Sequence, residues 1–244
     1  MKLWYANIWL NPETGYDDDY RYEFTLHTRF ISNFFSKQIR KFKFETDGTF
    51  NMISVNPMSN KLEECKIVPE TALTAVVPFD QERYEKIKGK ADCEYYLELL
   101  EDGFRKASKF KEVPLDTLLE LIDNFRRNSC KNEWQHKKKR FKEQDIEVVL
   151  NCYFTTLDFK LLATINRIST REELCAGVVI RTEPDEIYFD KMFKDILIDK
   201  ENITITDASD SPRILINLRN ALNKELSFVL LGNKKVKELL SYAR

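Results

Sequence analysis

The strongest structural signal in this chain is a pair of consecutive alternating patterns over residues 146–165. Apolar side chains occupy every second position from 146 to 154, and the alternation resumes from Leu157 to Ile165. A period of two places successive side chains on opposite faces of a strand, so each run predicts a half-buried strand. Two such runs joined by a short turn predict an antiparallel pair.

The rest of the second half is also predicted to be mainly strand. Short apolar runs indicate single strands over residues 178–181 and 226–231 and a hairpin of two strands over residues 195–206. Ser211-Pro212 fits the start of a helix, although Ile214 and Ile216 leave a strand open there. Residues 236–240 predict a C-terminal amphipathic helix.

The first half mixes predicted strands and helices. Two strands over residues 2–10 and 20–26 are interpreted as a hairpin, and Thr28 as the cap of a following helix. Asp47-Gly48 indicates a second hairpin. An extended segment and two helices are predicted further on, over residues 66–79, 80–109 and 115–125.

These elements predict an α+β fold with mainly antiparallel sheet, hairpins and several amphipathic helices. Strands that alternate with grouped helices, rather than regular βαβ units, favour that class. We expect one α+β domain over residues 1–244, and residues 108–114 are the predicted joint if it divides into two subdomains. With 43% hydrophobic residues, the chain can bury a substantial core.

The cysteines and the apolar runs bear on the compartment. The five cysteines are odd in number and widely spaced, which is typical of reduced thiols rather than of a disulfide framework. No run of about 18 apolar residues is present, and the N-terminus turns polar too early for a secretion signal. We therefore expect a cytoplasmic protein with reduced cysteines and no membrane partner.

The sequence lacks the arrangements that announce most enzyme chemistries. Its two histidines, His27 and His136, lie far apart, and its six glycines form no phosphate-binding loop. G-x-S-x-G, H-E-x-x-H and C-x-x-C are all absent. We therefore predict no catalytic residue, cofactor or metal site, which disfavours an enzyme. His27 is interpreted as a solvated residue on a polar strand face.

A basic segment spans residues 126–142, where only Glu133 opposes eight lysines and arginines. Trp134 and Phe141 are interleaved, and aromatic rings beside cations suit stacking on bases. The segment is therefore a candidate contact for nucleic acid or for an acidic protein. The alternative is a solvated, twisted hairpin whose lysines block edge-to-edge association. The candidate basic residues are Arg126, Arg127, Lys137, Lys138, Lys139 and Arg140.

An acidic segment lies downstream, over residues 183–210, where nine acids face three lysines. A run of three aspartates near the N-terminus adds a second acidic spot. Acidic surfaces attract cationic partners and determine which partner binds, whereas the alternative reading is solubilising charge. The candidate partner-binding residues are Asp17, Asp18, Asp19, Asp185, Glu186 and Asp190.

A carboxylate–lysine nuclease site is a further candidate. Nucleases of the restriction-endonuclease type place one Asp on a strand and an acid-x-Lys on the next, so that the group holds a divalent metal at a phosphodiester. Asp145 precedes one predicted strand here, and Asp158-Phe159-Lys160 opens the next. The pattern is permissive, so ordinary hairpin surface residues explain it better.

The leading functional hypothesis is a non-catalytic cytosolic protein that binds a partner protein by surface complementarity. Its most specific form is a bacterial immunity protein that neutralises a toxin domain, whose active site an acidic patch would cover. The alternative is a nucleic-acid-binding protein or metal-dependent nuclease that uses the basic segment over residues 126–142.

Overall fold

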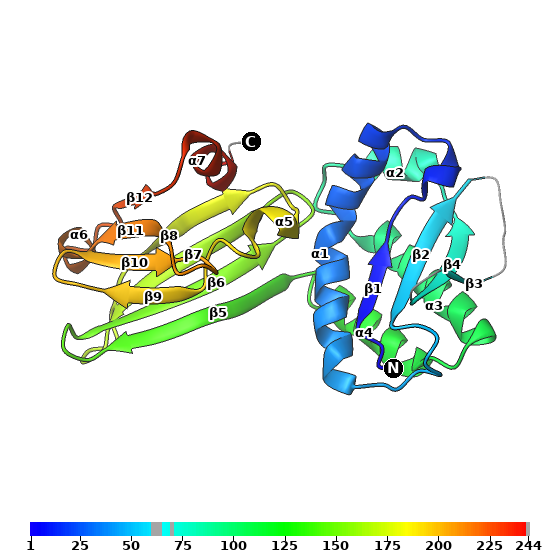
Figure 1. Cartoon of the computed structure of the whole chain (residues 1–244), viewed down its shortest axis with the longest axis horizontal. Coiled ribbons are helices and arrows are strands. Elements are labelled where there is room, and N and C mark those ends of the chain that lie inside the picture. Colours follow the sequence, from blue (N-terminus) through cyan, green and yellow to red (C-terminus); the bar gives the residue numbers. More distant parts are fainter. Residues whose placement is uncertain (60–64, 69–70, 243–244) are drawn as a thin grey trace. The chain divides into compact units, whose positions relative to one another are not determined.

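The computed structural model describes residues 1–59, 65–68 and 71–242 and confirms an α+β fold with mainly antiparallel sheet (Figure 1). The chain divides into two compact units. Unit 1 comprises residues 1–132 and 155–157, and unit 2 comprises residues 133–154 and 158–244. The chain therefore passes from unit 1 to unit 2 after Asn132 and returns briefly to unit 1 at residues 155–157.

Unit 1 is built on a sheet with the strand order β1-β2-β4-β3. β1 (Tyr5–Ile8), β2 (Met52–Met58) and β4 (Ala72–Pro78) run parallel, and β3 (Lys66–Val68) is antiparallel to β4 at one edge. Parallel neighbours need a long crossover, and α1 (Asp18–Phe42) provides it between β1 and β2. The hairpin predicted at Asp47-Gly48 is therefore wrong, because β2 pairs with parallel strands on both sides.

The hairpin predicted over residues 2–10 and 20–26 is also wrong, because residues 20–26 belong to α1. The buried side chains of this helix lie on one face at helical spacing: Phe24, His27, Thr28, Phe30, Ile31, Phe35 and Ile39. Thr28 lies inside the helix and is not its cap. His27 is buried, and its Nδ1 lies 3.1 Å from the Tyr84 hydroxyl.

The cap of α1 is Asp17, whose carboxylate accepts the backbone N–H of Tyr20 at 2.8 Å. We expect Asp17→Ala to destabilise the protein by about 1 kcal/mol, because the helix loses a partner for an otherwise unsatisfied N–H. Asp17→Asn should leave stability nearly unchanged, since asparagine caps equally well. Urea unfolding of the two variants measures the difference, and equal losses would show that the charge matters rather than the cap.

Three further helices complete unit 1: α2 (Gln81–Ile87), α3 (Glu94–Phe110) and α4 (Leu115–Arg127). Residues 80–109, predicted as helical throughout, are interrupted around Gly89, which has a φ of 69° that favours glycine. The predicted joint at residues 108–114 connects α3 to α4, and both helices belong to unit 1. α3 packs on β2 and β4, and its Gly103 lies directly over Val55 of β2.

Unit 2 contains two four-stranded sheets (Figure 1). One has the order β5-β6-β7-β8, with bounds Asn132–Phe141, Ile146–Phe154, Phe159–Arg167 and Glu173–Thr182. The other has the order β12-β11-β10-β9, with β9 at Asp195–Ile198, β10 at Asn202–Thr206, β11 at Pro212–Asn217 and β12 at Phe228–Leu230. Three short helices accompany them: α5 (Glu186–Phe189), α6 (Leu218–Leu222) and α7 (Lys234–Leu240).

Strand register in unit 2 confirms the alternating patterns of the sequence. β6 and β7 form the predicted antiparallel pair, with Leu150 opposite Ala163. The buried rows of β9–β12 contain Ile196, Ile205 and Ile214 in mutual register. Residues 212–217 form β11 and not a helix, because Ile214 and Ile216 both face the core.

The five cysteines are not all reduced, contrary to the sequence prediction. Cys93 and Cys130 form a disulfide, whereas Cys65, Cys152 and Cys175 are buried and lie outside this bond. The sequence hides this pair because 37 residues separate its members. α3 and α4 pack as neighbouring helices, so the residue that precedes α3 lies beside the residues that follow α4.

Candidate protein-binding surface

The predicted basic residues are divided between the two units, and several of them are engaged by neighbouring side chains. Arg126 and Arg127 lie on α4 in unit 1, whereas residues 137–140 lie on β5 in unit 2. Arg126 holds the Glu94 carboxylate, with its Nη2 2.7 Å from Oε1. Arg127 donates to the side-chain oxygen of Asn124 at 2.6 Å.

The lysines of β5 pair with carboxylates on both faces of the strand. Lys137 and Lys139 approach Asp195 of β9 at 3.2 and 3.1 Å. Lys138 and Arg140 approach Glu147 of β6 at 2.9 and 2.5 Å. β5 is an edge strand, so these pairs support the reading in which its lysines protect a sheet edge.

The acids of residues 183–210 are also engaged within unit 2. Asp185 is buried and caps α5 by accepting the Ile187 N–H at 3.1 Å. Asp207 is buried too, 2.7 Å from Nη2 of Arg213. Glu186 is half-buried on α5, and only Asp190 of the predicted trio is exposed. Asp190, Asp199, Glu201 and Asp210 are nevertheless exposed, so the segment keeps part of its negative charge at the surface.

The ionised Asp195 carboxylate is expected to make the free energy of unfolding depend on pH in the acid range. The Ile196 N–H and the ammonium groups of Lys139 and Lys137 lower its pKa to about 2. A lowered pKa contributes stability above its ordinary value of about 4, and that contribution is lost as the pH falls toward 2. We expect Asp195→Asn to be less stable than wild type at pH 7 and nearly equal to it near pH 2. Urea titrations at both pH values test this, and a constant gap would contradict it.

The nuclease residues lie at opposite ends of one hairpin. Asp145 precedes β6, whereas Asp158 precedes its partner β7, and β6 pairs with β7 over nine residues. At about 3.4 Å per residue, roughly 30 Å of strand separates the two carboxylates, so they cannot share a metal ion. Asp158 instead binds Arg181 at 2.6 Å and Lys160 at 3.2 Å. Within the described ranges, no three His, Cys, Asp or Glu side chains are grouped to hold a metal.

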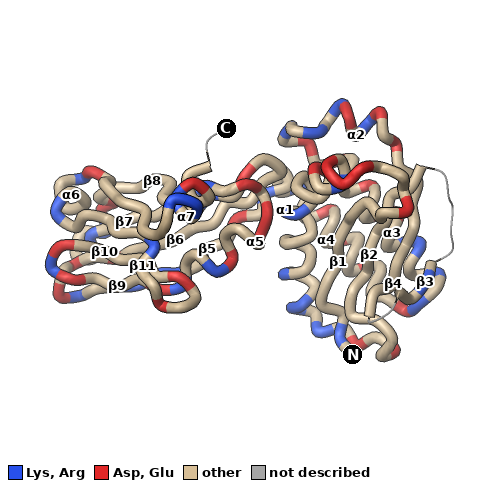
Figure 2. Tube along the Cα trace, turned by 45° about the horizontal axis from the view of Figure 1, so that its top comes forward, with Lys and Arg blue, Asp and Glu red and all other residues tan. Residues whose placement is uncertain are grey.

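The three N-terminal aspartates belong to a larger acidic surface. They begin α1, and α2 lies beside that end of the helix, as the 3.0 Å bond from the Tyr16 hydroxyl to Gln81 shows. Residues 16–23 and 80–88 together carry seven carboxylates and four basic side chains (Figure 2). We call the carboxylates of this set the acidic surface: Asp17, Asp18, Asp19, Glu23, Asp80, Glu82 and Glu85.

Tyrosine rings lie among these carboxylates. Tyr16 stacks on Tyr20 with ring centroids 4.7 Å apart, and Tyr20 meets Tyr84 edge to face at 5.6 Å. Burial and the Glu85 carboxylate raise the pKa of Tyr20, so its hydroxyl stays protonated at neutral pH. Tyr22 is 43% exposed. A hollow of about 390 Å³ is lined by Asp17, Asp19, Tyr20, Tyr22, Glu23 and Leu26.

The basic side chains nearby are mostly committed to ion pairs. Lys88 binds both Glu23 and Glu85, at 3.2 and 3.0 Å. Arg83 pairs with Glu98 of α3, outside the acidic surface. Asp18 pairs with Arg21, yet its own side chain remains 92% exposed. The exposed charge at the start of α1 is therefore predominantly negative.

The sequence identified Asp17–Asp19 but missed the α2 members of this surface. Asp80, Glu82 and Glu85 lie more than 60 residues away in the chain. They reach α1 only because the parallel sheet and its crossovers place α2 there. No local pattern signals that arrangement.

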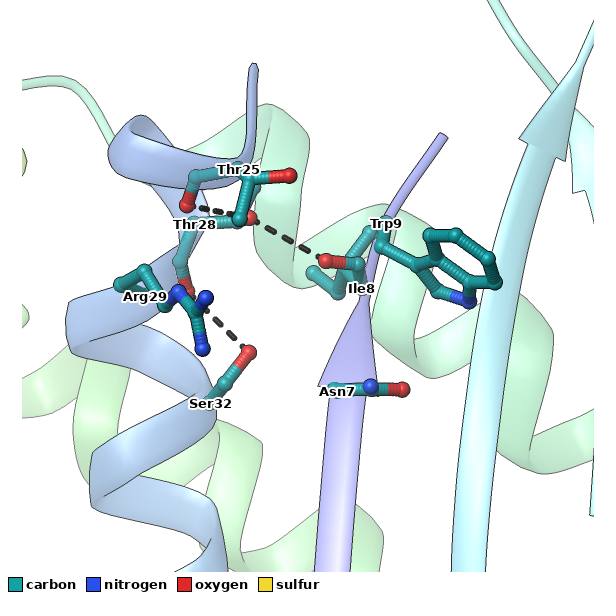
Figure 3. A pocket seen from close by; sticks show the side chains of 7 residues that line it. All are labelled: Asn7, Ile8, Trp9, Thr25, Thr28, Arg29 and Ser32. Carbon is teal, nitrogen blue, oxygen red and sulfur yellow. Dashed lines mark hydrogen bonds between the residues drawn. The ribbon is translucent and has the colours of Figure 1, made fainter. Parts of the chain in front are cut away.

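A second hollow, of about 310 Å³, lies between β1 and α1 (Figure 3). Its lining contains Asn7, Trp9, Thr25, Thr28, Arg29 and Ser32. The polar groups on the helix serve the backbone: Thr28 Oγ1 lies 3.2 Å from the Ile8 carbonyl oxygen, and Ser32 donates to the Thr28 carbonyl at 3.2 Å. The Thr28 hydroxyl therefore covers a carbonyl at the open edge of β1, whereas the Ser32 hydroxyl bonds within α1.

Comparison with protein-family models, with curated proteins and with solved structures finds no match to this chain. None of the helices in the described part of the chain has both the length and the apolar character needed to cross a bilayer.

Proposed function

We propose that this chain is a non-catalytic binding protein that acts by surface complementarity, and that the acidic surface of unit 1 receives a cationic segment of a partner protein. The observation that carries the proposal is the exposed run Asp17–Asp19 next to the carboxylates of α2 and the half-exposed Tyr22. Charge of one sign speeds encounter with an oppositely charged partner, and tyrosine is enriched at binding hot spots.

The basic and acidic segments outside this surface contribute less to the proposal. Many of their side chains are paired with one another or cap helices, so a partner would have to break those interactions first. Asp17, Asp18 and Asp19 are adjacent and all exposed, although Asp18 pairs with Arg21 and Asp17 accepts the Tyr20 N–H. Of the predicted partner-binding residues, we therefore keep Asp17, Asp18 and Asp19 in the proposal.

The most specific form of the proposal is an immunity protein that neutralises a toxin domain. Many toxin active sites are cationic because they bind phosphates, and an acidic surface with protruding tyrosines can cover such a site. The experiment is co-production of this chain with the polypeptide encoded by the adjacent gene. Stable co-purification and protection of the host from that polypeptide support the proposal. A neighbour that neither binds nor harms the host contradicts the immunity form.

A further inference from the structure

We propose that the Cys93–Cys130 bond is a redox-responsive tether that holds the boundary between the two units to the loop before α3. This inference is independent of the partner. Cys93 is buried at the start of α3, and Cys130 lies three residues before unit 2 begins at Glu133. The bond therefore connects a helix of unit 1 to the segment through which the chain leaves that unit.

The turn that contains Cys130 depends on few local interactions. Ser129 and Cys130 have φ values of 55° and 54°, in the left-handed region that non-glycine residues rarely adopt. The backbone bonds of the turn run from the Ser129 N–H to the Arg126 carbonyl and from the Cys130 N–H to the Phe125 carbonyl, both 2.9 Å long, and from the Lys131 N–H to the Asn128 carbonyl at 3.3 Å. Such a conformation persists only where the surroundings impose it, and the disulfide is one of those constraints.

The segment over residues 155–157, where the chain returns to unit 1, contacts the same loop. The Thr156 hydroxyl, in the turn between β6 and β7, donates to the Lys90 carbonyl at 2.9 Å. Lys90 lies three residues before Cys93, so both chain crossings attach to the loop over residues 88–93. A constraint within this loop acts on both connections between the units.

Unit 1 does not depend on the bond for its core. Beside the disulfide, Arg126 holds Glu94 through its Nε and Nη2 atoms, and the packed rings of Phe34 and Phe125 join α1 to α4 at 4.1 Å. Asn132 is buried and donates to the Phe30 carbonyl at 2.7 Å, so reduction should release the turn at residues 128–131 and leave Asn132 and the helices packed. The bond would then control the conformation of this turn without being required for the folding of unit 1.

The chemistry is a two-electron thiol–disulfide exchange. A dithiol reductant supplies two electrons and two protons, so that the S–S bond breaks, two cysteine thiols form and the dithiol becomes a cyclic disulfide. A disulfide oxidant such as oxidised glutathione reverses the reaction and leaves as two thiols. In a reducing compartment such bonds are usually transient and regulatory, which suits this position.

The test uses the full chain treated either with oxidised glutathione or with dithiothreitol. After alkylation and digestion, the oxidised protein should yield a linked peptide that contains both cysteines. Limited trypsin treatment should cleave after Lys131 about tenfold faster in the reduced form, because cleavage tracks local opening. The helical circular dichroism signal should be the same in both forms.

Two results would overturn the inference. One is the absence of a linked peptide from folded, oxidised protein. The other is equal cleavage of the two forms at this segment. The Cys93→Ser/Cys130→Ser variant is the control, and it should be cleaved at the fast rate under both treatments. A Cys65→Ser variant should respond as wild type does, since the Cys93–Cys130 bond does not include Cys65.

Discussion

Replacing Gly103 with alanine should destabilise unit 1 by about 1–3 kcal/mol, the usual cost of overpacking a core. In an unpacked helix the same change would stabilise by up to about 1 kcal/mol, so the sign of the effect is diagnostic. A Cβ at this position would lie 2.3 Å from Cγ2 of Val55, which is fully buried in the central strand β2. Neither α3 nor the strand can move away without losing its other contacts.

Two comparisons isolate the cause of that loss. Val55→Ala removes both methyl groups that the new Cβ would meet, so the double variant with Gly103→Ala should lose less than the sum of the two single variants. Gly177→Ala is the matched control in unit 2. Its new Cβ meets the end of the flexible Leu226 side chain, which can rotate away. Denaturant unfolding gives all four values. A stabilised Gly103→Ala variant would show that α3 does not pack on β2 in this way.

The strands of unit 2 could be predicted from sequence because their pattern is local. Successive residues of β6 and β7 face the core and the opposite side of the sheet in turn. The register of the pair follows from the four-residue turn over residues 155–158. The choice between helix and strand at residues 212–217 was harder, since Ile214 and Ile216 fit a strand while Ser211-Pro212 fits a helix start. Pairing with β10 on one side and β12 on the other decides in favour of a strand.

The start of α1 could not be predicted, because its residues satisfy two periods at once. Tyr20, Tyr22, Phe24 and Leu26 alternate as a strand would, yet Phe24 and the buried positions after it continue at helical spacing. What selects the helix is tertiary: β2 accepts β1 as a parallel neighbour, and a parallel pair requires a crossover. The sheet of unit 1 thus overrides a local strand signal.

The candidate site was predicted only in part, for a related reason. A sequence shows where charged residues cluster, but it does not show which residues of the fold form ion pairs or hydrogen bonds with them. Lys137 and Lys139 find Asp195, which lies on another sheet, and Asp185 is occupied as a helix cap. Asp17–Asp19 are exposed at the start of a long helix, where negative charge is favourable.

The second large effect concerns partner capture by the acidic surface. The variant Asp17→Asn/Asp18→Asn/Asp19→Asn removes three negative charges while asparagine keeps the helix cap. We expect it to associate with a cationic partner about tenfold more slowly at low ionic strength, because charges at an interface act mainly on the encounter rate. Its melting temperature should change little, since exposed charges usually contribute within about 0.5 kcal/mol.

The matched control removes positive charge from β5 instead. Lys138→Ala with Arg140→Ala removes two cations from β5 and should leave the association rate unchanged. Glu147 then loses its partners, so the control is used only after its melting curve shows a folded protein.

The most direct measurement is the association rate of the polypeptide from the adjacent gene with immobilised wild type and the triple asparagine variant, at two salt concentrations. The Debye length shortens from about 30 Å at 0.01 M salt to about 8 Å at 0.15 M. The proposal predicts a wide gap between the two proteins at low salt and a much narrower one at 0.15 M. Equal rates at low salt, together with loss of binding in the Lys138→Ala/Arg140→Ala variant, would place the functional surface on β5 and contradict the proposal.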